Sequence, residues 1–522
     1  MRLEELLKGV AAECVLGNLR APASGLSCDS RAVRAGDLFV ALSGTKSDGH
    51  AFVRQALEAG AAGAVVERPE VFESLRAGGV SGVAVLVRDS RKALARLSAN
   101  FHGNPSHRLT VAGITGTNGK TTTSYLCESV LQAAGLRPGV LGTVNYRVAG
   151  EAWPSTHTTP GPLELEALLV RMAKAGARSV VMEVSSHALS QCRVDSVEFD
   201  AVLFTNLTQD HLDFHPTMND YFLAKRRLFT EVLGDQRLKK TPALVINADD
   251  ESGRKLLAEA KAAGRRVLAY TLSKDGGSAS GACEIYPASL SWDAAGFRAR
   301  VRTPVGDLNL RSPLPGEHNV YNALAAVGMG VGLGLLPGVI EQGIASCVRV
   351  PGRLDPVPNS LGITVLVDYA HSPDALRNVL PAARKLARGK VLCVFGCGGD
   401  RDRAKRPLMA RAVSELADLA ILTSDNPRAE DPAQILADTR AGLQGQEGRE
   451  YVIESDRRKA ITIAIERAQA GDVVLLAGKG HEDYQIVGTE KRHFDDREEA
   501  ARALRGREGA AASGQGRSGG GS

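Results

Sequence analysis

The stretch that decides the fold reads Gly113-Ile-Thr-Gly-Thr-Asn-Gly-Lys-Thr-Thr-Thr123. It follows the apolar run Leu109-Thr-Val-Ala and opens a helical pattern, which predicts a strand, a glycine-rich loop and a helix. Glycines let backbone N–H groups close on phosphate oxygens, and the helix N-terminus adds positive potential. Lys120 can neutralise phosphate charge and the Thr121 hydroxyl can hold Mg²⁺, so ATP is the first ligand to consider.

The spacing of this loop departs from the general phosphate-loop pattern by one residue. That pattern places a glycine five residues before the Gly-Lys pair, a position that Ile114 occupies here, whereas Gly113 comes one residue early. A glycine-rich connector with an incidental lysine is therefore the alternative interpretation. The preceding strand pattern and the Lys-Thr-Thr ending favour the phosphate site.

Length and composition bound the class of protein. The chain has 522 residues, more than one hydrophobic core supports, which predicts about three domains. A net charge of +5 without a polybasic run, with 4% aromatic residues, gives no sign of nucleic-acid binding. The eight scattered cysteines lack a zinc spacing, and we expect reduced thiols in the cytoplasm. Neither a signal peptide nor a membrane span is expected.

Strand and helix patterns alternate along the chain and predict three α/β domains followed by a tail. The predicted ranges are 1–106, 107–345, 346–506 and a disordered tail at 507–522. Within the central domain, closely spaced alternating strands near 282–311, with turns at Gly296 and Gly306, predict a small antiparallel insert. The third domain has the pattern of a doubly wound parallel sheet, whose ligands collect at the carboxyl ends of the strands.

Two acidic or histidine-containing segments follow strands of the central domain. Glu183 ends an apolar run about where a nucleotide enzyme places an acid for Mg²⁺, and a polar segment from Val184 to Arg193 follows it. Asn206-Leu-Thr-Gln-Asp-His211-Leu-Asp-Phe-His215 follows another strand and suits magnesium or a structural role better than zinc. The alternatives are a solvent-facing glutamate and ordinary cap and turn residues.

Charged residues also follow the strands of the third domain. Arg401 and Arg428 each come just after a strand and could form bidentate bonds with carboxylates, although loop arginines are common. Glu482, in Gly478-Lys-Gly-His-Glu, could face an ammonium group. A site with both kinds of group suits a zwitterion such as an amino acid.

In combination these motifs resemble the Mur ligases, ATP-dependent amide ligases of peptidoglycan precursor synthesis, which serve cell-wall biogenesis, cell shape and cell division. The resemblance covers nearly the whole chain and is closest to the members that add diaminopimelate. The motifs that carry it are Asp29-Ser-Arg, Gly116-Thr-Asn-Gly-Lys-Thr-Thr, Glu183-Val-Ser-Ser-His, Asp210-His-Leu-Asp, Pro351-Gly-Arg-Leu-Asp, Asp368-Tyr-Ala-His-Ser-Pro-Asp, Asp425-Asn-Pro-Arg and Gly478-Lys-Gly-His-Glu. The family's own loop, Gly-Thr-x-Gly-Lys-Thr/Ser, also accounts for the unusual spacing.

The resemblance assigns roles around ATP. It implies ATP contacts at Gly116, Thr117, Asn118, Gly119, Lys120, Thr121, Asn322, Arg353, Asp355 and His371. It implies Mg²⁺ at Thr121, Glu183, His211 and Lys225, and Lys225 matches a lysine that the family carbamylates. Carbamylation requires a neutral amine, so the pKa of Lys225 must be lowered. Lys120, Lys225, His211 and Glu183 are the expected catalytic residues.

The resemblance also implies two substrate sites. A UDP-MurNAc-dipeptide would contact Cys28, Ser30, Thr158, Thr159, Ser185, Gln191 and Arg193, with a uridine pocket that departs from the family around Cys28 and Thr45-Lys-Ser. Diaminopimelate would contact Arg401, Asp425, Asn426, Arg428, Gly478 and Glu482. A site built to bond the second carboxylate of diaminopimelate rejects lysine by roughly 10⁴-fold or more, because a buried arginine would be left unpaired.

The resulting hypothesis is a cytoplasmic, monomeric ligase that forms an acyl phosphate and then an amide. In it, closure of the last domain completes the ATP site. A lysine-adding relative, a folylpolyglutamate-type ligase and a non-catalytic nucleotide-binding protein remain as alternatives. Phosphate release with different acceptors distinguishes them.

Overall fold

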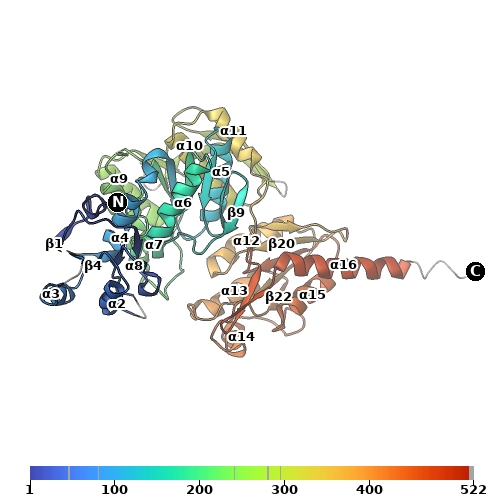
Figure 1. Ribbon diagram of the computed structural model, residues 1–522. Coiled ribbons are helices and arrows are strands. Elements are labelled where there is room, and N and C mark those ends of the chain that lie inside the picture. Colours follow the sequence, from blue (N-terminus) through green and yellow to red (C-terminus); the bar gives the residue numbers. More distant parts are fainter. Residues whose placement is uncertain (45–46, 80–81, 240, 279–280, 294–295, 516–522) are drawn as a thin grey trace, which may run out of the picture.

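Three mainly parallel sheets follow one another along the chain (Figure 1). The computed structural model describes residues 1–44, 47–79, 82–239, 241–278, 281–293 and 296–515. We keep the names N-terminal, central and C-terminal domain for residues 1–106, 107–345 and 346–506. The predicted α/β class is confirmed by the parallel strands, which alternate with helices in every sheet.

The N-terminal domain is a five-stranded sheet in the order β1-β5-β4-β3-β2, with β1 antiparallel to β5 and the other pairs parallel. Its strands are β1 Ala12–Leu16, β2 Gly25–Ser27, β3 Asp37–Val40, β4 Gly63–Val66 and β5 Val83–Val87. Its helices are α1 Leu3–Leu6, α2 Val53–Glu58, α3 Pro69–Ala77 and α4 Ser90–Phe101, with short 3₁₀ turns η1 Ser30–Ala32, η2 Gly49–Phe52 and η3 Pro105–Arg108. Helices α1 and α4 cover one face, and α2 and α3 cover the other.

The central domain is an eight-stranded sheet in the order β13-β12-β11-β6-β10-β7-β8-β9, parallel from β13 to β7. The strands are β6 Thr110–Thr115, β7 Pro138–Leu141, β8 Asn145–Val148, β9 Glu151–Pro154, β10 Ser179–Glu183, β11 Ala201–Phe204, β12 Ala243–Asn247 and β13 Val267–Tyr270. The helices are α5 Lys120–Ala133, α6 Pro162–Lys174, α7 Ser186–Ser190, α8 Met218–Arg227, α9 Glu251–Ala262, α10 Glu317–Gly332 and α11 Pro337–Ser346, with a π-helical turn at Leu228–Val232.

Strand β11 shows why this sheet is buried on both faces. Ala201 and Leu203 pack toward α5, α10 and α11, whereas Val202 and Phe204 pack toward the layer that contains α6 and α9. Because successive side chains of a strand point to opposite faces, a continuous apolar run serves both layers at once. The carboxyl ends of β6, β10 and β11 therefore lie at one edge, where their loops form the candidate site.

The predicted antiparallel insert is confirmed. Strands β16 Tyr286–Asp293, β17 Gly296–Arg302 and β18 Leu308–Ser312 form an antiparallel sheet, preceded by a short pair, β14 Gly277–Ser278 and β15 Gly281–Ala282. Its inner face packs into the same core as α10 and α11. Gly306 lies in the turn between β17 and β18 with φ 115°, a conformation that favours glycine.

The C-terminal domain is doubly wound, as predicted. Its six strands have the order β19-β20-β24-β21-β22-β23, and all pairs are parallel except β19 with β20. They are β19 Asp355–Val357, β20 Thr364–Asp368, β21 Val391–Phe395, β22 Leu419–Leu422, β23 Tyr451–Ile453 and β24 Val473–Ala477, with an added hairpin of β25 Tyr484–Val487 and β26 Glu490–His493. Helices α12 Pro373–Leu386, α13 Lys405–Leu416 and α14 Pro432–Arg440 cover one face, and α15 Arg457–Arg467 and α16 Asp496–Gln515 cover the other.

Helix α16 corrects the prediction of a disordered tail from residue 507. The helix continues to Gln515, and residues 516–522 lie outside the described part of the chain. Arg507 donates hydrogen bonds to the carbonyl oxygens of Ile465 and Ala468, and Glu508 accepts hydrogen bonds from Ser360. These contacts hold Arg507 and Glu508 against the C-terminal domain. The Gly, Ser and Ala content of the tail gave no indication of them. Of the helices in the described residues, none has the length and apolar character needed to cross a membrane.

Candidate active site

The glycine-rich loop connects β6 to α5 and packs its backbone directly against neighbouring loops. Gly116 has φ 147°, and a Cβ atom there would lie 1.8 Å from Thr205 Oγ1. Gly119 has φ 85°, and a Cβ atom there would lie 2.5 Å from Asn322 Oδ1. No other residue type fits these two positions without displacing its neighbours. The loop thus has the close backbone approach that phosphate cradles require.

Two lysine amines converge on this loop. Lys120 Nζ donates to the carbonyl oxygens of Gly116 at 2.8 Å and Thr117 at 2.7 Å, and Lys225 Nζ donates to Gly116 O at 2.8 Å. Helix α8, which begins with a capping box of Thr217 and Asp220, carries Lys225 to a position where it is 1% exposed. Burial lowers the pKa of Lys120, and burial together with Lys120 lowers that of Lys225 well below its usual value. A neutral amine at Lys225 is the form that carbamylation requires.

Glu183 connects the phosphate loop to the rest of the site. Its carboxylate ends β10, is 1% exposed and accepts hydrogen bonds from Thr121 Oγ1 at 3.1 Å and Thr143 Oγ1 at 2.9 Å. Mg²⁺ in nucleotide sites is usually held by one or two protein ligands plus phosphate oxygens and water. The adjacent carboxylate and hydroxyl fit that mode. Among the described residues, no three His, Cys, Asp or Glu side chains cluster closely enough to hold a metal ion by themselves.

A second polar cluster lies where the central and C-terminal domains meet. Asp210 has three basic atoms around it: His211 Nε2 at 3.7 Å, His371 Nε2 at 4.0 Å and Lys405 Nζ at 3.8 Å. Burial alone would raise the pKa of Asp210, but these three residues hold it below its usual value. Burial lowers the pKa of His211 to about 3, so its imidazole is neutral near pH 7 and able to bind a metal.

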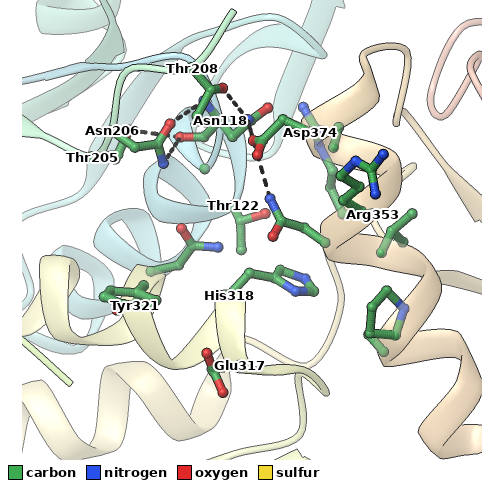
Figure 2. A pocket seen from close by; sticks show the side chains of 18 of the residues that line it. Asn118, Thr122, Thr205, Asn206, Thr208, Glu317, His318, Tyr321, Arg353 and Asp374 are labelled. Atoms are coloured by element: carbon green, nitrogen blue, oxygen red, sulfur yellow. Dashed lines mark hydrogen bonds between the residues drawn. The ribbon is translucent and has the colours of Figure 1, made fainter. Parts of the chain in front are cut away.

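A cavity of about 500 Å³ lies between α10 and α12 beside the phosphate loop (Figure 2). Asn118 crosses this junction and donates a hydrogen bond to Asp374 at 2.8 Å. Arg353, which donates to Thr121 Oγ1 at 3.3 Å, faces His318 and Tyr321 of α10 across the cavity. This size and mixed polar lining suit a nucleotide. Both domains therefore contribute to one pocket.

A third group of polar side chains follows β10. Thr159 Oγ1 donates to Glu183 O at 2.8 Å and accepts a hydrogen bond from Ser185 N at 3.0 Å. Arg193 Nη1 donates to Thr159 O at 2.7 Å, and its other nitrogens donate to Gln191 Oε1 at 2.8 and 3.1 Å. These residues form a continuous hydrogen-bonded surface next to Glu183. An arginine and several hydroxyls held in this way can bind an anionic substrate.

The fourth group lies at the carboxyl ends of β21, β22 and β24. Lys479 is fully buried, and its amine donates to Tyr484 O at 2.6 Å and Asn426 Oδ1 at 3.1 Å and lies 3.3 Å from Asp425 Oδ1. Asn426 Nδ2 in turn donates to Glu482 Oε2 at 2.9 Å. Burial would raise the pKa of Asp425, but Lys479 and Arg457 hold it below its usual value. Burial and Asp425 raise the pKa of Glu482.

Two arginines flank a glycine beside these acids. A Cβ atom on Gly398 would lie 2.9 Å from Arg428 Nη1 and 3.9 Å from Arg401 Cγ. Arg428 has a left-handed backbone, φ 54°, held by hydrogen bonds with Ile486 and Gly488 of the β25–β26 hairpin. The two arginines and the two acids therefore lie on neighbouring loops that Asn426 connects, with its backbone oxygen near Gly398 and its side-chain amide bonded to Glu482. Such a group of cations and acids suits an amino acid with several charged groups.

Three family models match the chain in order. The Mur ligase family catalytic domain matches residues 22–102, the Mur ligase middle domain residues 114–330, and the Mur ligase glutamate ligase domain residues 352–480. The UDP-N-acetylmuramoyl-L-alanyl-D-glutamate–2,6-diaminopimelate ligase of Geobacter sulfurreducens is 47% identical over 97% of this chain and 99% of its own length. The chain belongs to the Mur ligase family.

Further relatives agree with this assignment. The enzyme of the same name from Gloeobacter violaceus is 47% identical over 97% of this chain and 98% of its own length. A solved structure of a UDP-N-acetylmuramoyl-L-alanyl-D-glutamate–2,6-diaminopimelate ligase matches with a TM-score of 0.68 at 32% identity, over 97% of this chain and 99% of that chain. The MurF ligase of Thermotoga maritima in complex with ADP has a TM-score of 0.58 at 20% identity, over 94% of this chain and 100% of that chain, which shows a shared fold.

The Mur ligase brings most of its predicted site residues together. Asn118, Gly119, Asn322 and Arg353 line the cavity beside the phosphate loop, whereas Gly116, Thr117, Lys120, Thr121, Asp355 and His371 are not among its lining residues. Asp355 is buried and paired with Arg349, and His371 lies beside Asp210 instead. In the N-terminal domain, Cys28 is exposed after β2 and Ser30 begins η1, apart from the hydrogen-bonded group around Thr159. Thr158 is 3.1 Å from Thr143, which bonds Glu183.

Sequence reasoning missed several residues of this Mur ligase. Lys479 lies within the Gly478-Lys-Gly-His-Glu motif and Lys405 begins α13, and a lysine in a loop or at a helix end is ordinarily interpreted as a solvated charge. Only burial distinguishes them. The cavity also has members that no motif indicated: Asn247, Asp249, Asp250, Trp292, Arg377, Asn378 and Lys385.

Proposed function

We propose that this Mur ligase joins 2,6-diaminopimelate, in its meso form, to the D-glutamate carboxylate of UDP-MurNAc-L-Ala-D-Glu. The reaction consumes ATP and releases ADP and phosphate. The observation that supports the acceptor assignment is the approach of Arg401 and Arg428 to Gly398, next to the loop in which Asn426 bonds Glu482 and Asp425 pairs with Lys479. Diaminopimelate carries an ammonium and a carboxylate at each end, which such a pocket can pair. The printed names of the relatives support the same acceptor.

The first step is phosphoryl transfer. The substrate carboxylate attacks the γ-phosphorus of ATP, an acyl phosphate forms, and ADP leaves. Positioning and charge neutralisation are the main contributions in reactions of this kind. Lys120 would leave its bonds to the loop carbonyls and contact the phosphates, and the N–H groups that open α5 would bind their oxygens.

Thr121 and Glu183 would hold one Mg²⁺, and His211 with a carbamylated Lys225 would hold a second. Bound Mg²⁺ would neutralise charge on the transferring phosphoryl group. The neutral state of His211 and the low pKa of Lys225 support these roles. Without carbon dioxide, Lys225 would retain its amine and its bond to Gly116.

The second step forms the amide. The free amine of the acceptor attacks the acyl carbon, and phosphate is the leaving group. The C-terminal domain orients the acceptor, and the group around Thr159, Ser185 and Arg193 would hold the dipeptide and its carboxylate. Because Asn118 bonds Asp374 across the domain junction, closure of the C-terminal domain would align both reactants and exclude water.

The experiment measures phosphate release with ATP, Mg²⁺ and UDP-MurNAc-L-Ala-D-Glu. Separate reactions contain meso-, LL- or DD-diaminopimelate, lysine or no acceptor. We expect release with meso-diaminopimelate only. Release with lysine alone would indicate a lysine-adding enzyme, and absence of acceptor-dependent release would contradict the ligase assignment. We further propose that the enzyme works as a cytoplasmic monomer, which size-exclusion chromatography with light scattering tests.

A further inference from the structure

Lys405 is a buried cation in the seam between two domains. It is the first residue of α13, is 8% exposed, and its amine lies 3.8 Å from Asp210 Oδ1 of the central domain. Among the described residues, no hydrogen bond to this amine is formed and Asp210 is its one carboxylate neighbour within 4.0 Å. A lysine removed from water normally has a close anion or several acceptors. Lys405 has neither in this arrangement.

Asp210 is also too far from the Lys405 amine to accept a hydrogen bond from it. His211 and His371 lie within 4.0 Å of the same carboxylate. The charge of Asp210 acts to raise the pKa of Lys120 and of Lys225, against the effect of burial. Both amines are therefore close enough to interact with this carboxylate. Glu183, the other acid of the site, is already bonded to Thr121 and Thr143. Within the described residues, the Lys405 amine is therefore left without a hydrogen-bond acceptor, and an anionic ligand would supply one.

The position of Lys405 identifies the chemistry of that anion. The amine approaches the phosphate-loop side of the seam, next to the residue that precedes His211, while the helix it begins belongs to the acceptor domain. The N-cap residue Ala404 supplies no side-chain cap, and Asp402 accepts a hydrogen bond from the backbone N–H of Ala404 at the start of α13. A cation contributed across the seam is suited to oxygens that gain charge during phosphoryl transfer.

We infer that Lys405 binds the γ-phosphoryl group of ATP as it passes to the substrate carboxylate, with Asp210 holding the amine in place beforehand. This inference rests on the proposed ligase function. Lys405 would then be the group through which the acceptor domain takes part in the first step. Acyl phosphate would form fast only when that domain is closed, so ATP would not be hydrolysed while the domain is open.

Nucleotide binding gives a test that does not depend on the acceptor. The affinities of ADP and of the non-hydrolysable analogue AMP-PCP are measured by calorimetry for the wild type, Lys405→Met, Lys405→Arg and Lys459→Met. Lys459 is exposed on α15 and serves as the matched control. We expect Lys405→Met to weaken AMP-PCP binding by about tenfold and to leave ADP binding unchanged. Equal affinities in wild type and Lys405→Met for both nucleotides would refute the phosphoryl contact.

Turnover supplies the second readout. Lys405→Met should lower kcat for acceptor-dependent phosphate release by roughly 10²–10³-fold, the effect of removing one preorganised donor from a transition state. The KM for diaminopimelate should stay within threefold, Lys405→Arg should recover at least tenfold in kcat, and Lys459→Met should match the wild type. Thermal melting confirms that each variant is folded. If Lys405→Met changed only the KM for diaminopimelate, Lys405 would contact the acceptor carboxylate and the inference would be overturned. If the wild type released no phosphate but Lys405→Met still weakened AMP-PCP binding and not ADP binding, the proposed function would be overturned and the inference would stand.

Discussion

In the phosphate loop two lysine amines donate to carbonyl oxygens of the loop itself, whereas in the proposed acceptor pocket Lys479 donates to the side chain of Asn426 as well as to the carbonyl oxygen of Tyr484. The loop amines must exchange these carbonyls for phosphate when ATP arrives. Lys479 has no such exchange to make, because its partners Asn426 and Asp425 are already in place. The nucleotide side therefore rearranges on binding, and the acceptor side is largely preorganised.

Replacement of Lys120 should have the largest effect. Lys120→Met removes the cation that opens α5, and we expect phosphate release to fall by roughly 10³-fold, as for loss of a strong transition-state donor. Calorimetry should show unchanged diaminopimelate binding, because the acceptor pocket lies in another domain. A loss of diaminopimelate affinity in Lys120→Met would show that the nucleotide site and the acceptor pocket are energetically coupled, and would contradict the expected independence of the two sites.

Replacement of Arg428 should affect the acceptor side alone. Arg428→Ala removes one of the two arginines beside Gly398, and we expect kcat/KM for diaminopimelate to fall by roughly 10²–10³-fold. ADP binding should not change. Arg449→Ala, an exposed arginine of the same domain, is the control. If Arg428→Ala had the same kcat/KM for diaminopimelate as the wild type, residues other than Arg428 would determine acceptor binding.

The buried support of the acceptor pocket should be visible as stability. Arg457 and Asp496 form an ion pair in which both side chains are 0% exposed, and Arg457 also donates to Ala477 O at 3.0 Å. Arg457→Met leaves Asp496 buried without a partner, so the free energy of unfolding of the C-terminal domain should fall by roughly 3–5 kcal/mol. Scanning calorimetry measures this. Arg492→Ala, which breaks an exposed pair with Glu490, should cost no more than about 1 kcal/mol, and a similar loss in both variants would contradict the expected difference.

The junction of the N-terminal and central domains should give the smallest effect on activity, and its effect on stability depends on pH. Burial raises the pKa of Glu166 on α6 to about 8, although Arg96 of α4 opposes the shift. The folded state then binds a proton that the unfolded state has released, so stability falls as pH rises from about 4.5 to about 8.

Glu166→Gln removes this proton linkage. Its melting temperature should exceed that of the wild type by roughly 10 °C at pH 8, because each unit by which the pKa is raised corresponds to about 1.4 kcal/mol and each kcal/mol to about 2–4 °C. At pH 5 the difference should vanish, and activity at either substrate site should not change. A melting temperature that rises equally at both pH values would indicate better packing instead.

The sequence allowed prediction of the elements whose signal is local. The apolar run before the phosphate loop forms strand β6, and the run that ends at Glu183 forms strand β10, because a short apolar run defines each strand without reference to the rest of the chain. The hairpin of β25 and β26 was missed because β26 is exposed, β25 is only half-buried, and neither strand has a long apolar run. Lys479 and Lys405 were missed for a related reason: their roles depend on burial between segments far apart in the sequence, which no local pattern records.

The bonds of Lys479 have a consequence for how acceptor preference can change between relatives. One lysine ties the loop of Asp425 and Asn426 to the loop of Gly478 and Glu482, and the β25–β26 hairpin fixes the backbone of Arg428. A chimera that receives only the Asp-Asn-Pro-Arg segment would meet a foreign lysine and a foreign hairpin. The segments from β22 to β26 therefore act as one unit. We expect a chimera to acquire a new acceptor preference only when these segments are exchanged together.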